Sequence, residues 1–212
     1  MSIKKLSFHP IQSIKDTITN LKWSRQRRKK GYCEYDLYSV SNWFIQVMPN
    51  MIDEIRLKRY VIPGVLLEEA GKSYNVDFQK DYFNLPEEVQ DKIEKEANTK
   101  WDEILTRMVF LMREAHEDTC SRKNPYEEEY YKAREEFATK YGDFGEKLLT
   151  KEDKEYAKKT GGCRAYFMYD LPEYAGIHNK YFEEEGKIHE YREACQREGL
   201  AMFVNWFSYL GI

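Results

Sequence analysis

Apolar residues recur with a helical period from Trp101 to Ala115, and this is the most regular pattern in the chain. The residues that share the period are Trp101, Ile104, Leu105, Met108, Val109, Met112 and Ala115. They lie on one face of an α-helix, and such a face is buried against other elements. Asn84 and Pro86 predict the start of this helix, and Asn124-Pro125 predicts its end. We expect it to be the central core helix of an all-α fold.

The composition is that of a folded chain with little net charge. Apolar residues make up 42% of the 212 residues and aromatic residues 15%, which is not the profile of a disordered chain. The 34 basic and 37 acidic residues nearly cancel, so no whole-molecule field attracts the protein to nucleic acid or to an anionic membrane. The longest apolar stretch, Leu200 to Leu210, is too short to span a bilayer, and we expect no membrane insertion.

The cysteines and the start of the chain indicate a reducing compartment. The four cysteines form no Cys-x-x-Cys pair, so buried free thiols are expected rather than a zinc site, with Cys163 the best candidate for an exposed thiol. The polar Met1-Ser2-Ile3-Lys4-Lys5 start has no secretory signal. We therefore expect a cytoplasmic location.

A turn near Gly31 separates two helices in the N-terminal part of the chain. Cationic residues just before Gly31 favour the negative end of a helix dipole, and glycine suits the left-handed stop, so the first helix should end near residue 30. Ser39 or Asp36 can cap the second helix. We prefer Ser39, because Tyr38 and Trp43 then stand at the two positions of a hydrophobic staple.

Prolines and glycines divide the rest of the chain. Pro49 predicts a kink in the second helix. Residues 60–84 form an irregular connection with one short helix at about 65–70. The last helix is expected to begin near Asn179 and to bend at Gly199.

A charged segment at 126–160 is dense in Glu and Lys, and Gly142 and Gly145 mark a break between two helices. We expect a solvated helical pair that projects from the body, followed by an aromatic loop at 161–172. The sequence thus predicts a single all-α domain over 1–212, an irregular multi-helix bundle with a charged helical appendage.

Three motifs point to a family. They are the Lys-Gly-aromatic-Cys-x-x-Asp opening at Lys30 to Asp36, the pair Trp43-Phe44, and Trp-x-x-Ile-Leu-x-x-Met at Trp101 to Met108. Together they resemble a family of small helical proteins encoded by tailed bacteriophages and prophages. The resemblance implies a phage origin and assigns no catalytic residues.

One acidic cluster could hold a divalent cation. Glu114, Glu117 and Asp118 lie three and four residues apart at the end of the central helix, so they can share a face. Helical nucleotide pyrophosphohydrolases use acidic helices of this kind, although this chain lacks their doubled acidic motif. A metal-dependent phosphohydrolase is therefore one hypothesis, and a solvated helix end is the simpler explanation.

A cationic run from Arg25 to Lys30, with Trp23 before it and Tyr32 after it, combines positive charge with stacking surfaces. Arg25, Arg27 and Arg28 are thus candidates for contact with nucleic acid. Helix-end charge compensation explains the same residues. A related hypothesis is an enclosed anion or nucleotide site, which would be built from Arg25, Arg28, Arg164, Tyr166 and Tyr169.

The aromatic loop at 161–172 is a candidate surface for a protein partner, because aromatic residues are enriched in interfaces as well as in cores. Tyr166, Phe167, Tyr169 and the nearby Tyr174 are the residues in question. With no recognisable catalytic site, we favour a non-enzymatic phage accessory protein that binds a host or defence-system protein. No cofactor is expected for this function, while the phosphohydrolase hypothesis requires a divalent metal.

Overall fold

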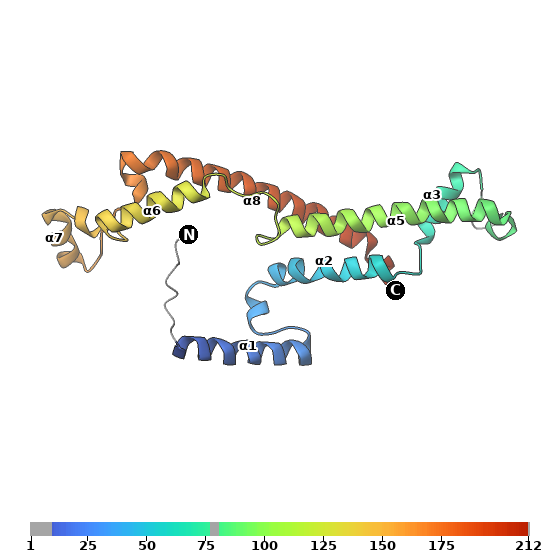
Figure 1. The fold of residues 1–212 in the computed structure, drawn as a ribbon, viewed down its shortest axis with the longest axis horizontal. Coiled ribbons are helices and arrows are strands. Elements are labelled where there is room, and N and C mark those ends of the chain that lie inside the picture. The colour runs from blue at the N-terminus through green and yellow to red at the C-terminus, as the bar shows by residue number, and fades with distance from the viewer. Residues whose placement is uncertain (1–9, 77–80, 212) are drawn as a thin grey trace, which may run out of the picture.

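The computed structural model describes residues 10–76 and 81–211, with side chains from residue 17 onward, and it confirms the all-α fold. The described residues contain seven α-helices and no strand, arranged in an elongated molecule (Figure 1). The α-helices are α1 (Pro10–Lys30), α2 (Val40–Lys58), α3 (Gly64–Ser73), α5 (Glu87–Ala115), α6 (Glu127–Tyr141), α7 (Lys151–Thr160) and α8 (Pro172–Trp206). The 3-10 helices are η1 (Tyr35–Tyr38), η2 (Tyr82–Asn84), η3 (Glu146–Leu148), η4 (Met168–Asp170) and η5 (Phe207–Tyr209).

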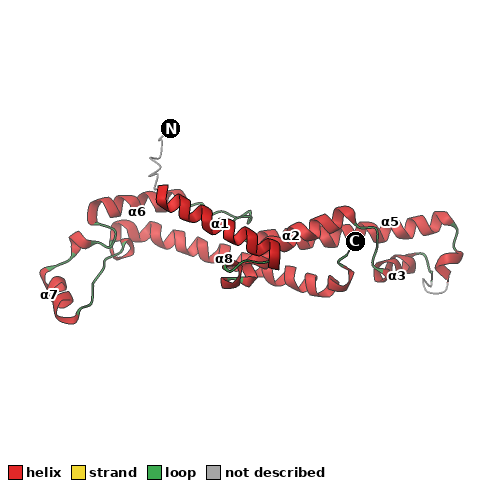
Figure 2. Ribbon diagram, turned by 90° about the horizontal axis from the view of Figure 1, so that it is seen from below, coloured by secondary structure: helices red, strands yellow, loops and turns green. Residues whose placement is uncertain are grey.

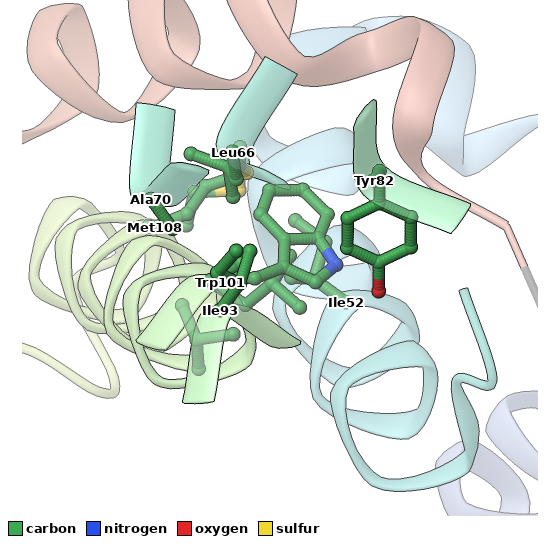
Figure 3. Packing of buried hydrophobic residues seen from close by; sticks show 11 residues of the cluster. Ile52, Leu66, Ala70, Tyr82, Ile93, Trp101 and Met108 are labelled. Atoms are coloured by element: carbon green, nitrogen blue, oxygen red, sulfur yellow. The ribbon is translucent and has the colours of Figure 1, made fainter. Parts of the chain in front are cut away.

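The main core forms around α5, as the periodic pattern predicts. Helices α2, α3 and the C-terminal part of α8 pack against α5, and Trp101 is buried at the centre among Ile52, Leu66 and Tyr82 (Figure 3). The ring of Trp101 also contacts Trp206 on α8, with centroids 5.2 Å apart. The apolar face of α5 thus joins three other helices in one core.

A second core lies at the other end of the molecule. Its buried residues are Tyr130 and Phe137 on α6, Met168 in η4, and Tyr174 on α8. Helix α6 lies along α8, and α7 stands beyond them at the end of the molecule (Figures 1 and 2). The predicted charged helical pair is therefore confirmed as α6 and α7, but α6 is packed against α8.

The break between α6 and α7 depends on glycine, as predicted. Gly142 and Gly145 have φ values of 90° and 64°, in the left-handed region that other residues rarely adopt. At Gly145 a Cβ would lie 2.7 Å from the Cβ of Tyr166. The backbone of Gly145 must therefore pass close to the chain that follows α7.

The N-terminal elements confirm the predicted end of the first helix and the start of the second after Ser39, and they contradict the predicted Ser39 side-chain cap and the staple. Helix α1 ends at Lys30, and Gly31 follows with φ 80°. Helix α2 begins after Ser39, but the Ser39 side chain makes no capping hydrogen bond. The predicted staple is wrong, because Tyr38 is 88% exposed. Helix α2 continues through the buried Pro49.

Two predicted helix boundaries are also wrong. Helix α5 ends at Ala115, well before Asn124, because the chain turns back so that Ser121 can donate hydrogen bonds to Glu114. Helix α8 begins at Pro172 rather than near Asn179, because proline suits the first helical turn and the turn that follows packs on α6.

Gly199 allows α8 to pack closely against α5. The helix continues through this position, and a Cβ there would lie 3.3 Å from side-chain atoms of Leu111 and Met112 on α5. Glycine therefore lets the two longest helices approach each other. Three cysteines, Cys33, Cys120 and Cys195, are buried free thiols, and Cys163 is exposed, as expected.

Candidate functional site

Glu114 is buried, and its carboxylate is occupied by donors from the protein. It is 4% exposed and accepts hydrogen bonds from the backbone N–H of Ser121 at 3.1 Å, from the Ser121 hydroxyl at 2.8 Å and from the Tyr191 hydroxyl at 3.0 Å. Burial alone raises the pKa of Glu114, but the bonds from Ser121, Tyr191 and Cys120 outweigh it and hold the pKa below its ordinary value. Glu114 thus joins α5, the turn after it and α8.

The other two carboxylates of the predicted metal site face solvent. The side chains of Glu117 and Asp118 are each 82% exposed. Glu117 lies 3.8 Å from Arg192, and Asp118 lies 3.9 Å from His116. Glu114, Glu117 and Asp118 do not converge, and the described ranges 10–76 and 81–211 hold no group of three potential metal ligands. Glu114, Glu117 and Asp118 therefore do not form the carboxylate cluster that the phosphohydrolase hypothesis requires.

Arg27 holds α1 against the turn that follows it. Its Nε and Nη2 atoms donate to the Asp36 carboxylate at 3.0 and 2.5 Å, and the Cys33 backbone N–H donates to the same carboxylate at 2.7 Å. The bond from Arg27 is the main reason that the pKa of the buried Asp36 lies well below its usual range; burial opposes the shift, and the Cys33 N–H adds to it. Arg27 therefore has a structural partner.

Three further contacts complete the docked face of α1. Trp23 packs on Tyr35 with ring centroids 5.0 Å apart, Lys22 pairs with Glu34 at 2.7 Å, and the Gln26 side chain accepts from the Glu34 backbone N–H at 3.0 Å. Within the described chain, α1 has no extensive contact with another α-helix. Residues 33–36 are thus the main support of α1.

The opposite face of α1 is uncovered. At 3.6 residues per turn, Ile18, Leu21 and Arg25 fall on the side away from Trp23. Ile18 and Leu21 are 62% and 65% exposed. A shallow groove follows this face, and Lys22 and Gln26, which also contact Glu34, form its edge toward the docked face. The lining residues of the groove are Ile18, Leu21, Lys22, Arg25, Gln26, Lys29 and Lys30. We call these seven residues the α1 stripe.

The C-terminal end of α1 is strongly cationic. Arg25, Arg28, Lys29 and Lys30 are all exposed, and none of them forms an ion pair with a described residue. Arg25 and Arg28, two of the predicted nucleic-acid contacts, are therefore free to bind an anionic partner. Arg27, the third, is not.

Arg164 and Tyr166 are both bound to Asp153. The Arg164 guanidinium donates to the Asp153 carboxylate at 2.6 Å, and the Tyr166 hydroxyl donates at 3.1 Å. Asp153 also forms a capping box with Thr150 at the start of α7. Bonds from Thr150 first, and then from Arg164, hold the pKa of Asp153 well below its usual range.

The predicted anion pocket requires Arg25 and Arg28 to meet Arg164, Tyr166 and Tyr169. The structure does not bring these two groups together. Figures 1 and 2 place α7 at one end of the long axis and the C-terminal end of α1 nearer the middle. Arg164 is bound to Asp153 on α7, whereas Arg25 and Arg28 belong to α1. Tyr169 and Tyr166 have different contact partners. The ring of Tyr169 packs on His178 with centroids 5.0 Å apart, whereas the Tyr166 hydroxyl binds Asp153.

A continuous group of aromatic rings lies where η4 and α6 meet α8. The rings contact each other in the order Phe167, Tyr169, His178, Phe182, Tyr130 and Tyr131, with centroid separations between 4.5 and 5.7 Å. Phe167, Tyr169, Phe182 and Tyr131 are exposed. We call these four exposed residues the aromatic patch.

The residues of the aromatic patch differ from those of the predicted partner surface. Phe167 and Tyr169 belong to it, but Tyr174 is buried in the second core and Tyr166 is bound to Asp153. Phe182 and Tyr131 were not predicted, because each comes from a charged helical segment that meets the loop only in the fold. Two adjacent Tyr residues at 130–131 and the pair Tyr181-Phe182 are the only sequence signals of their role.

Carboxylates adjoin the aromatic patch. Burial first, and then the nearby Glu185, Tyr131 and Glu127, raise the pKa of Tyr181 to about 12. Glu127 and its neighbour Glu128 are exposed and form no ion pair with described residues. The patch is therefore apolar at its centre and acidic at the side formed by the start of α6.

Comparison with known proteins places this chain in no family. No protein-family model matches the sequence, and neither a curated protein nor a solved structure matches the chain. Among the described residues, each helix is too short or too polar to cross a membrane.

Proposed function

We propose that this chain is a non-enzymatic accessory protein that binds another protein, with α1 as its docking helix. The exposure of Ile18 and Leu21 on a face that no other part of the described chain covers is the observation that carries the proposal. The resemblance to phage and prophage proteins supports a host or defence-system protein as the partner and the host cytoplasm as the place of action. This function uses no cofactor.

The α1 stripe has the two properties that a docking helix needs. Covering Ile18 and Leu21 would contribute roughly 2–4 kcal/mol together, because each is about two-thirds exposed and a fully buried side chain of this size gains about 1.5–3 kcal/mol. Arg25 and Lys29 add positive charge on the same face, which accelerates encounter with an acidic partner and selects against basic ones. The preferred partner thus has an apolar groove with an acidic rim.

An affinity pull-down from bacterial lysate, with and without nuclease, tests the proposal. The tagged wild-type protein is compared with the double variant Ile18→Asp, Leu21→Asp and with the control Val204→Asp, which changes an equally exposed apolar residue on α8. We expect a stoichiometric protein that resists nuclease, is lost in the double variant and is kept in the control. A partner retained by the double variant would refute α1 as the docking helix.

Nucleic-acid binding is the second candidate function, supported by the unpaired Arg25, Arg28, Lys29 and Lys30. Titration of a fluorescent single strand at several salt concentrations tests it. If these residues contact phosphates, affinity falls steeply with salt, and Arg25→Glu with Arg28→Glu reduces the slope of log K against log salt by about 1.4. The matched control is Lys92→Glu with Lys95→Glu, on the exposed face of α5. An affinity that is independent of salt would exclude this function.

A further inference from the structure

We infer that the α1 stripe of one copy docks on the aromatic patch of a second copy. This inference rests on the proposed role of α1 as a docking helix, and it gives that helix an occupant in the absence of a foreign partner. Self-association would then control access to α1, since a helix held by a second copy cannot bind another protein at the same time.

The aromatic patch has the surface that the α1 stripe requires. Phe182 and Tyr131 expose about half of their side-chain area, so they offer apolar and π surface without first having to leave the core. Their neighbours Tyr130 and Tyr181 stack at 4.1 Å beneath them and form a rigid support. An aliphatic helix face can therefore lie on this patch without rearranging it.

The charges of the two surfaces are complementary. On α1, Ile18 and Leu21 come first, and Arg25 and Lys29 follow within about 16 Å along the helix, at about 1.5 Å per residue. Beside the patch, Glu127 and Glu128 are carboxylates without a cation among the described residues. Guanidinium groups also bind favourably over aromatic faces. Docking would pair free cations with free carboxylates, and apolar side chains with aromatic rings.

The occupant must come from a second copy because α1 is held away from the patch of its own chain. The Arg27–Asp36 contact and the Trp23–Tyr35 contact fix α1 to the turn before α2. Figure 1 shows α1 standing clear of α6 and α8, with no extensive contact to either helix. The α1 stripe and the aromatic patch of one molecule thus remain available to a neighbour.

The available area predicts a reversible complex. The α1 stripe runs from Ile18 to Lys30, about 20 Å at about 1.5 Å per residue, and a helix is about 10 Å wide, so docking one α1 stripe buries on the order of 400 Å² counted over both partners. Two reciprocal contacts bury on the order of 800 Å², the area of a weak, transient interface. A dimer of this size exchanges readily, which is what a second copy must do to release α1 for another protein.

Sedimentation velocity over a range of concentrations tests the inference. We expect wild type to shift from monomer to dimer with concentration, and Leu21→Glu and Phe182→Ala each to remain monomeric with unchanged circular dichroism. Because each variant keeps the surface that the other lacks, an equimolar mixture should recover dimers with one intact contact. Val204→Asp serves as the control and should dimerise like wild type.

Exchanging the charges of Arg25 and Glu127 gives a second test that does not depend on the apolar residues. Arg25→Glu and Glu127→Arg should each weaken the dimer by about tenfold, and the two together should restore it. A wild type that is monomeric at every concentration, or a dimer that tolerates both Leu21→Glu and Phe182→Ala, would overturn the inference. The proposed function would survive that result, because Phe182→Ala leaves α1 intact and should still capture the foreign partner.

Discussion

Replacing Asp36 by alanine should release α1 from the rest of the protein without unfolding the main core. Asp36 is buried and accepts hydrogen bonds from Arg27 and from the Cys33 backbone N–H. No other described contact between α1 and the chain after it is buried to the same extent, since the Lys22–Glu34 pair is exposed. The substitution therefore removes the main attachment of α1 and leaves the packing of α2, α5 and α8 unchanged.

The magnitude follows from the two lost interactions. A buried N–H at Cys33 left without an acceptor destabilises the docked state by about 1–3 kcal/mol. The ion pair contributes no more than about 1 kcal/mol, because Arg27 is half exposed and solvent screens the charge. The two contributions sum to about 1–4 kcal/mol, and the middle of this range, about 2–3 kcal/mol, corresponds to a change of about 30- to 150-fold in the docking equilibrium.

Hydrogen exchange measured by mass spectrometry resolves this local effect. Amides in residues 17–38 should exchange about 30- to 150-fold faster in Asp36→Ala, while those in α5 change less than twofold. Glu34→Ala is the matched control, because it removes only the exposed ion pair with Lys22. Equal acceleration in α1 and α5 would refute the reasoning, as would an unchanged α1.

Acidification should have the same effect as the substitution. The pKa of Asp36 is depressed in the folded protein, so the docked state is stabilised above the unfolded pKa of about 3.9 and loses that stability as the pH falls below it. After correction for intrinsic rates, wild-type exchange in residues 17–38 should rise below about pH 4. The variant Asp36→Ala should lack this rise.

Three further substitutions test the cores by thermal and urea unfolding. Trp101→Ala should lower the free energy of unfolding by about 3–5 kcal/mol, because the side chain is fully buried between α5 and its neighbours; a loss below 1 kcal/mol would contradict the central position of α5. Glu114→Ala should cost about 2–4 kcal/mol, because it leaves Ser121 and Tyr191 without their acceptor; an unchanged midpoint would show that solvent replaces it. Gly145→Ala should cost about 2–4 kcal/mol through backbone strain and a clash with the following chain, whereas Gly161→Ala, with strain but open space, should cost less.

Periodicity was sufficient to predict the central helix. Trp101, Leu105 and Met108 recur at steps that only an α-helix places on one face, and all three are fully buried. Leu111 and Glu114 lie outside the predicted face, and both are buried because α8 covers a second side of α5. A pattern on one helix reveals its apolar face, but it does not reveal a polar side that another helix covers.

The candidate sites depend on pairings between residues that are separated in the sequence. These pairings explain why the roles of some predicted site residues differ in the structure. Arg27 belongs to a cationic run, and only the partner nine residues later, Asp36, separates its role from those of Arg25 and Arg28. Arg164 similarly meets Asp153 across α7. In each case composition predicts the charge correctly, while the fold decides which charges remain free to bind.

Helix α8 gives the molecule a mechanical property. Its 35 residues span about 52 Å and belong to both cores, with Tyr174 in one and Trp206 against the other. A continuous helix is stiff over this length, so a tilt of about 5° about Gly199 displaces the N-terminal end, about 40 Å away, by about 3–4 Å and the C-terminal end, about 10 Å away, by about 1 Å. Gly199 lies where α8 crosses α5, and it acts as the fulcrum because a Cβ there would lie only 3.3 Å from side-chain atoms of Leu111 and Met112. A partner that displaces the end of α8 beside the aromatic patch would therefore also displace the C-terminal end, in the opposite direction.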